Sequence, residues 1–379
     1  MQIKFSEKIN KIIKNLALEA KNFGVKIYFV GGLARDVLMG INPCDIDILV
    51  EGSAIDFVKS LNFAQIKSQH LDFGTIKAQI EGIDIDFAST RVEIYPFPGC
   101  LPKVQKIGCN IKDDLIRRDF TINSVALEIT PDLDFKIIDP YFGQKDIKER
   151  TLKVLHDKSY IDDPARILRG LDFKLRFKGF DFSENDKKLI KNSLKTPNRE
   201  HLSKDRVILT LNKLFSDKSR AEKAFCEFVD KEYYKILFDY FPASKSNIKK
   251  AFRIFTPENT AQVYVKYILQ IGQNPSGEAL KVQMSNSRLE IYKHFKNLPQ
   301  EDICLYYALT LDKKALLYQR ELKDIKLNIA GRDLLALGFS KGRIIGEILD
   351  KVLRKKLAKN STIITFEDEI DYVRKTFIP

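Results

Sequence analysis

Residues 26–52 of the 379-residue chain read KIYFVGGLARDVLMGINPCDIDILVEG. The apolar run Ile27–Val30 predicts a strand that ends at the glycine pair Gly31–Gly32, and a short pattern with helical spacing follows. After a turn at Gly40–Pro43, a second strand is expected to open on Asp45-Ile46-Asp47. The stretch therefore predicts a strand–helix–strand unit with a tight glycine turn where its helix begins.

Side-chain alternation places Asp45 and Asp47 on one side of the second strand and Ile46 on the other. Two carboxylates on one face repel each other unless a positive charge lies between them. A hard divalent cation such as Mg²⁺ supplies that charge, because it prefers carboxylate oxygens and keeps waters and substrate phosphates as its other ligands. The alternative interpretation is an exposed strand face, since D-x-D pairs also arise by chance.

The glycine pair suits a triphosphate, because bare backbone N–H groups at a helix N-terminus attract anions. Arg35 and Asp36 follow on a face of the predicted helix that its apolar residues do not occupy. The glycine pair, Arg35-Asp36 and the D-x-D pair in this order are far more specific than any one of them.

Composition is ordinary for a globular protein, with 44% hydrophobic and 30% charged residues and room for two or three domains. No apolar run is long enough to span a bilayer, and the first ten residues do not resemble a signal peptide. The cysteines lack C-x-x-C spacing, so neither a zinc site nor a disulfide framework is expected and a reducing cytoplasm fits best. They are Cys44, Cys100, Cys109, Cys226 and Cys304.

The formal net charge of +13 favours an anionic macromolecular partner, with nucleic acid ahead of a membrane surface. The alternative is that the charge serves no particular partner. Basic clusters at 245–253 and 354–359 are expected to be solvated helix faces, whereas the recurring glycines of 331–346 suit tight turns or a close approach to phosphate. No histidine is paired at ligand spacing, so none is assigned to catalysis.

Periodicity predicts a mixed α/β head at about 1–140 followed by an all-helical remainder, hence an α+β fold. Strand signals fade beyond Leu155, and helical spacing dominates from Pro164 onward. The predicted elements of the head are helices over 5–23, 54–61 and 115–127, strands over 74–80, 83–88 and 135–138, a hairpin turn at 81–82, and a loop rich in proline and glycine over 91–104.

Asp86 is well placed to be the third carboxylate of a two-metal site, in which the metals clamp the attacking and leaving oxygens of a phosphoryl displacement. The alternative is that Asp84 and Asp86 only form the solvated face of an edge strand. Further along, Arg118 offers a forked donor for phosphate or ribose oxygens, and Asp119 and Asn123 are spaced for one helical face. Asp119 can accept from a ribose hydroxyl, cap the following helix, or do both.

Asp163 and Arg166 are one helical turn apart. An aspartate acceptor beside an arginine donor matches the amine and ring nitrogen of cytosine and adenine, and leaves polar groups unpaired against uracil or guanine. Asp163 followed by Pro164 is equally typical of a helix N-terminus, and that interpretation stays open.

Together these residues resemble the bacterial class II tRNA nucleotidyltransferases, which include CCA-adding, A-adding and CC-adding enzymes, and the related bacterial poly(A) polymerases. The resemblance is strong over about 1–215 and returns at 331–349. The matching motifs are Gly31-Gly32-x-x-Arg35-Asp36 with Asp45-x-Asp47, Arg117-Arg118-Asp119-Phe120-Thr121-Ile122-Asn123, Asp139-Pro140-x-x-Gly143-x-x-Asp146, Asp162-Asp163-x-x-Arg166-x-x-Arg169 and Leu202-Ser203-Lys204-Asp205-Arg206.

The resemblance implies a polymerase-beta-like catalytic head (1–140), a helical neck that recognises the base (141–215), and a helical body and tail that bind tRNA (216–379). It implies Asp45 and Asp47 as metal ligands, Asp86 as the third catalytic acid, and 91–103 as a flexible loop beside the site. Residues that contact RNA are not predicted. The implied nucleotide-binding residues are Gly31, Gly32, Arg35, Asp36, Arg118, Asp119, Asn123, Asp163, Arg166 and Arg169.

The expected activity is template-independent addition of CCA, or part of it, to tRNA 3′ ends from CTP and ATP with Mg²⁺. No membrane or protein partner is expected. The open alternatives are an A-adding or CC-adding enzyme, a poly(A) polymerase, and, from a different class, a catalytically inactive RNA-binding protein. Two positions depart from the family pattern: Asp162 replaces a glutamate, which puts nucleotide specificity in doubt, and Ser124 replaces an alanine.

Overall fold

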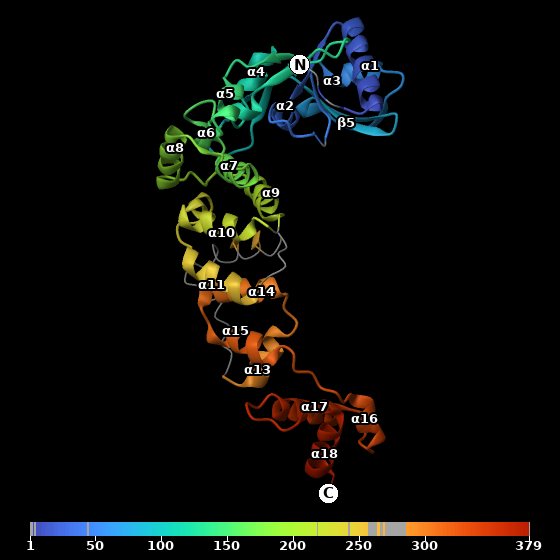
Figure 1. Ribbon diagram of the computed structural model, residues 1–379, viewed down its shortest axis with the longest axis vertical. Helices are drawn as coiled ribbons and strands as arrows, with labels where there is room; N and C mark the ends of the chain where they lie inside the picture. The colour runs from blue at the N-terminus through green and yellow to red at the C-terminus, as the bar shows by residue number, and fades with distance from the viewer. Residues whose placement is uncertain are drawn as a thin grey trace. The chain divides into compact units, whose positions relative to one another are not determined.

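The computed structural model describes residues 3, 5–43, 45–217, 219–241, 243–256, 264–265, 268–269 and 286–378. Cys44 and most of the segment 257–285, which was expected to be helical, lie outside these residues. The chain divides into two compact units, Met1–Leu214 with Lys235–Leu237, and Phe215–Tyr234 with Phe238–Pro379. A mixed sheet occupies the first unit and the second is helical (Figure 1), which confirms the α+β class.

The sheet of the first unit has the strand order β3-β4-β5-β2-β1-β8-β9. Strands β2 and β5 run parallel, and every other neighbouring pair is antiparallel. The parallel register sets Asp47 opposite Asp86, so two of the predicted acids lie side by side. The strands are β1 (Lys26–Val30), β2 (Asp47–Glu51), β3 (Gln65–His70), β4 (Thr75–Ile80), β5 (Ile83–Ser89), β8 (Ala126–Glu128) and β9 (Lys136–Ile138).

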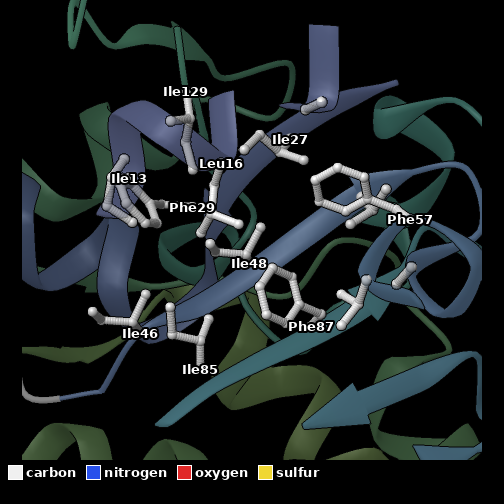
Figure 2. Close-up of a cluster of buried hydrophobic side chains, with 14 of the residues drawn as sticks. Ile13, Leu16, Ile27, Phe29, Ile46, Ile48, Phe57, Ile85, Phe87 and Ile129 are labelled. Atoms are coloured by element: carbon white, nitrogen blue, oxygen red, sulfur yellow. The ribbon is translucent and has the colours of Figure 1, made fainter. Parts of the chain in front are cut away.

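The main hydrophobic core lies on the face of the sheet that α1 (Glu7–Phe23) and α3 (Ala54–Ser60) cover. Figure 2 shows Phe29, Phe57 and Phe87 in this core among aliphatic side chains, with Phe29 near Leu16. Large apolar side chains from strands and helices bury here and stabilise the sheet. A smaller cluster on the opposite face involves α4 (Ile111–Ile116) and leaves the strand ends open for polar groups.

Helix α2 (Gly31–Leu38) follows β1 directly, as the glycine pair predicted. Strand β2 begins at Asp47, two residues later than expected, but Asp45 and Asp47 are exposed and Ile46 between them is buried. The backbone of Asp86 donates to the Ile46 carbonyl over 3.1 Å, which continues the strand pairing beyond the regular ladder. The predicted alternation therefore holds even where the strand has not yet begun.

The prediction of a loop over 91–104 is wrong at both ends. Strands β6 (Arg91–Ile94) and β7 (Lys103–Ile107) pair antiparallel and leave only 95–102 as the loop. No residue in this two-stranded sheet is fully buried, and the polar–apolar alternation in Arg91-Val92-Glu93-Ile94 covers only four residues, the minimum for a strand signal. The prediction of a loop over the whole segment rested on the prolines and the glycine between the two strands.

The predicted helix over 115–127 is also wrong, because α4 ends at Ile116 and a 3₁₀ turn, η2 (Thr121–Asn123), leads into β8. The carboxylate of Asp119 accepts from the backbone of Phe120 and from the Asn123 amide. Such local side-chain bonds compete with helical ones. Asp119 and Asn123 are therefore in contact, as their spacing predicted, although they do not lie on one α-helix.

The rest of the first unit is mostly helical, as expected beyond Pro164. The pair β10 (Thr151–Leu152) and β11 (Asp181–Phe182) is an exception, because β11 lies past the point where strand signals fade. The helices are α5 (Gly143–Lys148), α6 (Ser159–Asp162), α7 (Ala165–Arg176), α8 (Glu184–Lys195) and α9 (Lys204–Phe215).

The second unit contains short helices packed on aromatic side chains, among them Phe225 and Tyr264, whose rings meet edge to face. The helix α11 exposes most of the basic cluster 245–253 and buries Ile248 and Ala251. The elements are α10 (Ala221–Asp230), η3 (Tyr233–Ile236), α11 (Lys245–Phe255), α13 (Arg288–Phe295), α14 (Gln300–Thr310), α15 (Lys313–Leu317), the π-helix η4 (Tyr318–Leu322), α16 (Gly331–Ala336), α17 (Arg343–Lys356) and α18 (Phe366–Phe377).

Among the described residues, no helix is both long enough and apolar enough to cross a membrane. Cys100, Cys109, Cys226 and Cys304 are free thiols. The division into head, neck, and body with tail stays a prediction.

Candidate active site

A pocket of about 500 Å³ opens in the first unit beside the start of α2. Basic side chains outnumber acidic ones in its wall, which fits a polyanion such as a triphosphate. The basic residues are Arg35, Arg117, Arg118, Arg166, Arg169, Arg176, Arg206 and Lys213. The acidic residues are Asp36, Asp45, Asp47, Glu93 and Asp119.

The glycine turn brings the start of α2 close to an arginine. Gly31 has φ +62°, and a Cβ at this residue would lie 3.1 Å from Nη1 of Arg118. No side chain caps the helix at Val30, so its first N–H groups keep their capacity to bind an anion. Gly31 is therefore required both for its backbone conformation and for the approach of Arg118.

Asp45 and Asp47 lie just before and at the start of β2, and Asp86 lies in the middle of β5, opposite Asp47. Asp45 and Asp47 line the pocket, while Asp47 and Asp86 line a second, neighbouring hollow of about 450 Å³, with which the pocket also shares Arg117 and Arg118. Although Asp47 is exposed on the pocket surface, the protein around its carboxylate removes part of its solvation, and this desolvation, followed by repulsion from Asp86 and Asp45, raises its pKa, while Arg118 and Lys77 oppose the rise. Asp47 thus lines both hollows and has the carboxylates of Asp45 and Asp86 nearby.

These carboxylates fit a divalent cation by their chemistry, because oxygen donors suit Mg²⁺ and the repulsion at Asp47 is what a cation would relieve. Nζ of Lys77 lies 3.8 Å from Oδ2 of Asp86 and offsets part of the charge. Within the described part of the chain, no three acidic, histidine or cysteine side chains converge closely enough to form a ready metal site. A cation would therefore have to draw the aspartates together.

Arg117 and Arg118 are held by a buried carboxylate behind the pocket wall. Asp114, fully buried, accepts from Nη2 of Arg117 at 2.7 Å and from Nη2 of Arg118 at 2.9 Å. Glu93 pairs with Arg117 over 3.1 Å. The Nε of Arg118 is buried and has no hydrogen-bond partner, so this guanidinium keeps a donor for a ligand.

Asp119 and Asn123 lie next to each other in the pocket, and both are buried. Burial raises the pKa of Asp119, but the ion pair with Arg169, 2.7 Å from Nη2 to Oδ2, and the bond from Asn123 lower it, and the net shift is downward. Arg35 donates to Oδ1 of Asn123 over 2.7 Å. The carboxylate of Asp119 is therefore ionised and held from two sides.

Arg166 lines the pocket, but Asp163 does not. Oδ2 of Asp163 accepts from Nη2 of Arg206 at 2.6 Å, and its Oδ1 accepts from the backbone at the start of α7. Arg166 donates to Ser159 at 2.8 Å and to the Arg117 carbonyl at 3.0 Å, while its Nε is buried without a hydrogen bond. Asp163 thus binds the first N–H of α7, as the capping interpretation predicted, although the N-cap position itself is Pro164.

The two departures from the family pattern have local explanations. Asp162 lies 4.0 Å from Nδ1 of His156, and the ion-pair partner of Arg166 is Asp163, with Nε and Oδ2 3.6 Å apart. Ser124 is buried and donates to the Leu115 carbonyl over 2.6 Å. The hydroxyl at 124 therefore fits the interior without cost to the fold.

The pocket brings together all predicted site residues except Asp86 and Asp163, and it adds residues that the sequence analysis did not assign. Glu93 and Tyr95 come from the segment predicted to be a loop, and Arg206 belongs to a recognised motif that was given no role. No sequence signal marks Arg176. The predicted lining residues are Gly31, Gly32, Arg35, Asp36, Asp45, Asp47, Arg118, Asp119, Asn123, Arg166 and Arg169.

A mixed sheet with acids on two adjacent parallel strands, a glycine turn and an arginine-rich pocket are the features of a nucleotidyltransferase head. In agreement, residues 27–153 match the family model of the poly A polymerase head domain. The A-adding tRNA nucleotidyltransferase of Geobacter sulfurreducens is 28% identical over 414 residues, with 95% of this chain and 46% of that protein covered. The A-adding enzyme of Halalkalibacterium halodurans is 26% identical over 403 residues, with 97% and 92% covered.

Among solved structures, an apo form of a CCA-adding enzyme matches with a TM-score of 0.78 and 27% identity over 98% of this chain and 97% of that one. The Thermotoga maritima CCA-adding enzyme complexed with tRNA matches with a TM-score of 0.73 and 27% identity over 98% and 96%. Residues 27–153 therefore match a poly A polymerase head domain, and over nearly its whole length the chain is similar to class II tRNA nucleotidyltransferases. It spans 46% of the length of the Geobacter relative and 20% of the length of the A-adding relative from Aquifex aeolicus.

Proposed function

We propose that this protein is a template-independent tRNA nucleotidyltransferase that adds nucleotides from CTP and ATP to a tRNA 3′ end. The observation that carries the proposal is the position of Asp47, which lines both the arginine-rich pocket and the second hollow. Transfer of a nucleotide from one substrate to another needs a catalytic group at the point where the two binding sites meet. The 3′ hydroxyl of the acceptor attacks the α-phosphorus, a new O–P bond forms, the bond to the β-phosphate oxygen breaks, and pyrophosphate leaves.

Asp45 and Asp47 would hold Mg²⁺, with Asp86 as the third acid. When bound, the cation neutralises charge at the reacting phosphate and favours deprotonation of the hydroxyl. Asp86 is on the side of the second hollow, together with Lys77, His70 and Arg91. This hollow is where the 3′ end of the acceptor RNA would lie.

Within the pocket, the N–H groups at Gly31–Gly32 and the guanidinium of Arg118 would bind the triphosphate. The unpaired Nε of Arg118 supports this role, because a buried donor without a partner is costly unless a ligand pairs with it. Positioning and charge stabilisation of this kind account for most of the catalysis in phosphoryl transfer.

Asp119 would accept from a ribose hydroxyl beside Asn123. Arg166 would recognise the base through its Nε, which donates no hydrogen bond in this structure, because a donor there suits the ring nitrogen of cytosine or adenine. Asp163 joins in base recognition only if Arg206 releases it, since both of its oxygens already accept hydrogen bonds.

A second candidate is an enzyme that adds only A to a tRNA already ending in CC. It is favoured by the relatives, since the Geobacter and Halalkalibacterium proteins are both A-adding enzymes. Solved structures of similar fold are CCA-adding enzymes, including complexes with CTP and with ATP. The number and identity of the nucleotides added must therefore be measured.

The deciding experiment supplies tRNA transcripts that end before CCA, after C and after CC, with Mg²⁺ and each nucleoside triphosphate alone or mixed. Stepwise addition of C, C and A that then stops indicates a CCA-adding enzyme. Addition of A only to the transcript ending in CC indicates an A-adding enzyme, and C addition that stops before A a CC-adding one. An unlimited A ladder indicates a poly(A) polymerase, and no addition supports an inactive RNA-binding protein.

We expect Asp45→Ala or Asp47→Ala to abolish nucleotide addition and leave tRNA binding nearly unchanged, because the carboxylates act on the reacting phosphate. Primer extension and filter binding measure the two effects separately. Asp84→Ala, on the same strand as Asp86 but outside both hollows, is the matched control and should retain addition. Retained addition by either Asp45→Ala or Asp47→Ala would refute the assignment.

A further inference from the structure

Arg35 makes contacts that occupy all three guanidinium nitrogens. Its Nε and Nη2 donate to Oδ1 of Asp36 at 2.9 and 2.7 Å, and Nη1 donates to Oδ1 of Asn123 at 2.7 Å. Its Cζ also lies 5.2 Å from the ring centre of Phe173 and 4.9 Å from that of Phe177, both on or just after α7. With 3% of its surface exposed, Arg35 is fixed in place and directed at other side chains.

The bond from Arg35 sets the orientation of the Asn123 amide. Because Oδ1 of Asn123 accepts from Arg35, its Nδ2 is the atom that faces Asp119, and it donates to Oδ1 of Asp119 over 2.9 Å. The flipped amide would direct N–H groups at a guanidinium and a carbonyl oxygen at a carboxylate, which is unfavourable on both sides. A neutral amide thus connects a cation to an anion in one arrangement only.

The same arrangement decides which oxygen of Asp119 remains for a ligand. Oδ1 accepts from both Asn123 and the backbone of Phe120, at 2.9 Å each, so its lone pairs are used. Oδ2 is buried and in ion-pair contact with Arg169, but it accepts no hydrogen bond. Oδ2 is therefore the oxygen with capacity for a hydroxyl donor.

We propose that Arg35 is a positioning residue for ribose selection, which through Asn123 holds Asp119 so that Oδ2 accepts from the 2′-hydroxyl of the incoming nucleotide. The inference rests on the proposed function, since it concerns the nucleotide bound in the same pocket. It assigns Arg35 a role without direct contact to the substrate. Lysine is a poor replacement, because its compact ammonium lacks the planar fork that binds Asp36 through two nitrogens and Asn123 through the third, and lacks the flat surface that contacts both rings.

The test compares ATP with dATP, or CTP with dCTP, whichever the wild-type protein adds to a tRNA acceptor, and measures kcat/KM for each. We expect Arg35→Lys to reduce the preference for the ribonucleotide about tenfold, with the loss in kcat/KM of the ribonucleotide and little change for the deoxynucleotide. Asn123→Ser should do the same. Because the two residues act in series, the double variant should be no worse than Asn123→Ser alone.

Arg220→Lys is the matched control, since Arg220 is also a mostly buried arginine paired with an aspartate, Asp217 at 2.8 Å, but lies outside the pocket. It should leave the preference unchanged. Thermal unfolding checks that each variant is folded. If Arg35→Lys does not fold, Phe177→Leu, which removes one stacking ring and keeps the guanidinium, should lower the preference in the same direction.

Equal losses for ribonucleotide and deoxynucleotide, or additive effects in the double variant, would overturn the inference and assign Arg35 to general stability or phosphate binding. A wild-type protein that adds no nucleotide would instead refute the proposed function and this inference with it. An active wild type whose preference is unchanged in Arg35→Lys would overturn the inference alone.

Discussion

Asp114 never touches the pocket, yet it determines where two of the pocket's arginines lie. Its carboxylate accepts from Arg117, Arg118 and the backbone of Arg91. Burial raises its pKa, but the two guanidinium groups and their hydrogen bonds outweigh this, so the pKa is lower than the ordinary 3.8. A buried ion triad of this kind is costly to break, because removal of one partner leaves charges uncompensated.

At this scale we expect Asp114→Asn to reduce the free energy of unfolding at pH 7 by about 3 kcal/mol. Because the folded-state pKa is depressed, the stability from Asp114 is complete above the ordinary 3.8 and is lost as pH falls through the folded-state value. The wild-type protein should therefore lose more stability than Asp114→Asn as the pH falls below about 4. Urea unfolding across this range measures the difference.

The neighbouring Asp113, exposed on α4, supplies the control. Asp113→Asn should follow the wild-type pH profile. Parallel profiles for Asp114→Asn and the wild type would contradict the role assigned to Asp114.

Functional residues were predictable from the sequence where the residues that act together lie within a few positions of one another in the chain. The glycine pair, Asp45, Asp47 and Asp119 were found in this way. Asp114, Tyr95 and Arg176 were not, because their roles depend on contacts across long stretches of chain, such as Tyr95 with Arg166.

At the scale of elements, the hairpin between β4 and β5 was predicted because the turn itself carries the signal. Glu81 and Gly82 have φ of 49° and 82°, the left-handed pair that a two-residue hairpin turn requires. The β6–β7 hairpin was missed because its strands are exposed, and the helix over 115–127 was wrongly predicted because pairing of Leu127 with Phe29 outweighs the local pattern. Residue spacing alone reveals neither the pairing of β6 with β7 nor that of Leu127 with Phe29.

The tip of the β6–β7 hairpin is docked by backbone bonds. The N–H of Gly99 donates to the Asp162 carbonyl, and the N–H of Ser203 donates to the Gly99 carbonyl, both over 3.0 Å. The ring of Phe97 stacks near His201, with centroids 4.4 Å apart. Gly99 has φ +79°, and a Cβ there would lie 3.4 Å from the backbone of Asn198 and Leu202. The tip therefore depends on a glycine at 99.

We expect Gly99→Ala to loosen the tip and to make 95–102 several times more sensitive to limited proteolysis, because the left-handed conformation costs about 1 kcal/mol at the residue whose N–H and carbonyl make both docking bonds. Gly82→Ala is the control, since Gly82 has a nearly equal φ of +82° but open space around its Cβ position. Cleavage within 95–102 that is equal in the two variants would show that the docking bonds do not hold the tip.

At the scale of the whole molecule, the two compact units divide the proposed tasks. Every residue that lines the nucleotide pocket belongs to the first unit, and the second contributes helices with exposed basic faces, such as α11 and the end of α17. Fold class followed from the sequence, because strand and helix patterns separate along the chain. The way in which the basic helix faces contact a partner could not be predicted from the sequence, because exposed lysines follow no fixed spacing.

The net charge of +13 leads to a prediction about the intact protein. If its basic faces bind RNA phosphates, tRNA affinity should fall at least about 100-fold between about 50 and about 200 mM salt, because each neutralised phosphate releases counterions. Filter binding across a salt series measures the slope of log affinity against log salt. Asp45→Ala should keep that slope, because Asp45 acts in the pocket and not on the RNA backbone, and ATP binding should show a shallower slope because it engages fewer phosphates. A tRNA affinity that is flat in salt would mean that the excess charge serves no nucleic-acid partner, and the proposed division of tasks between the two units would fail.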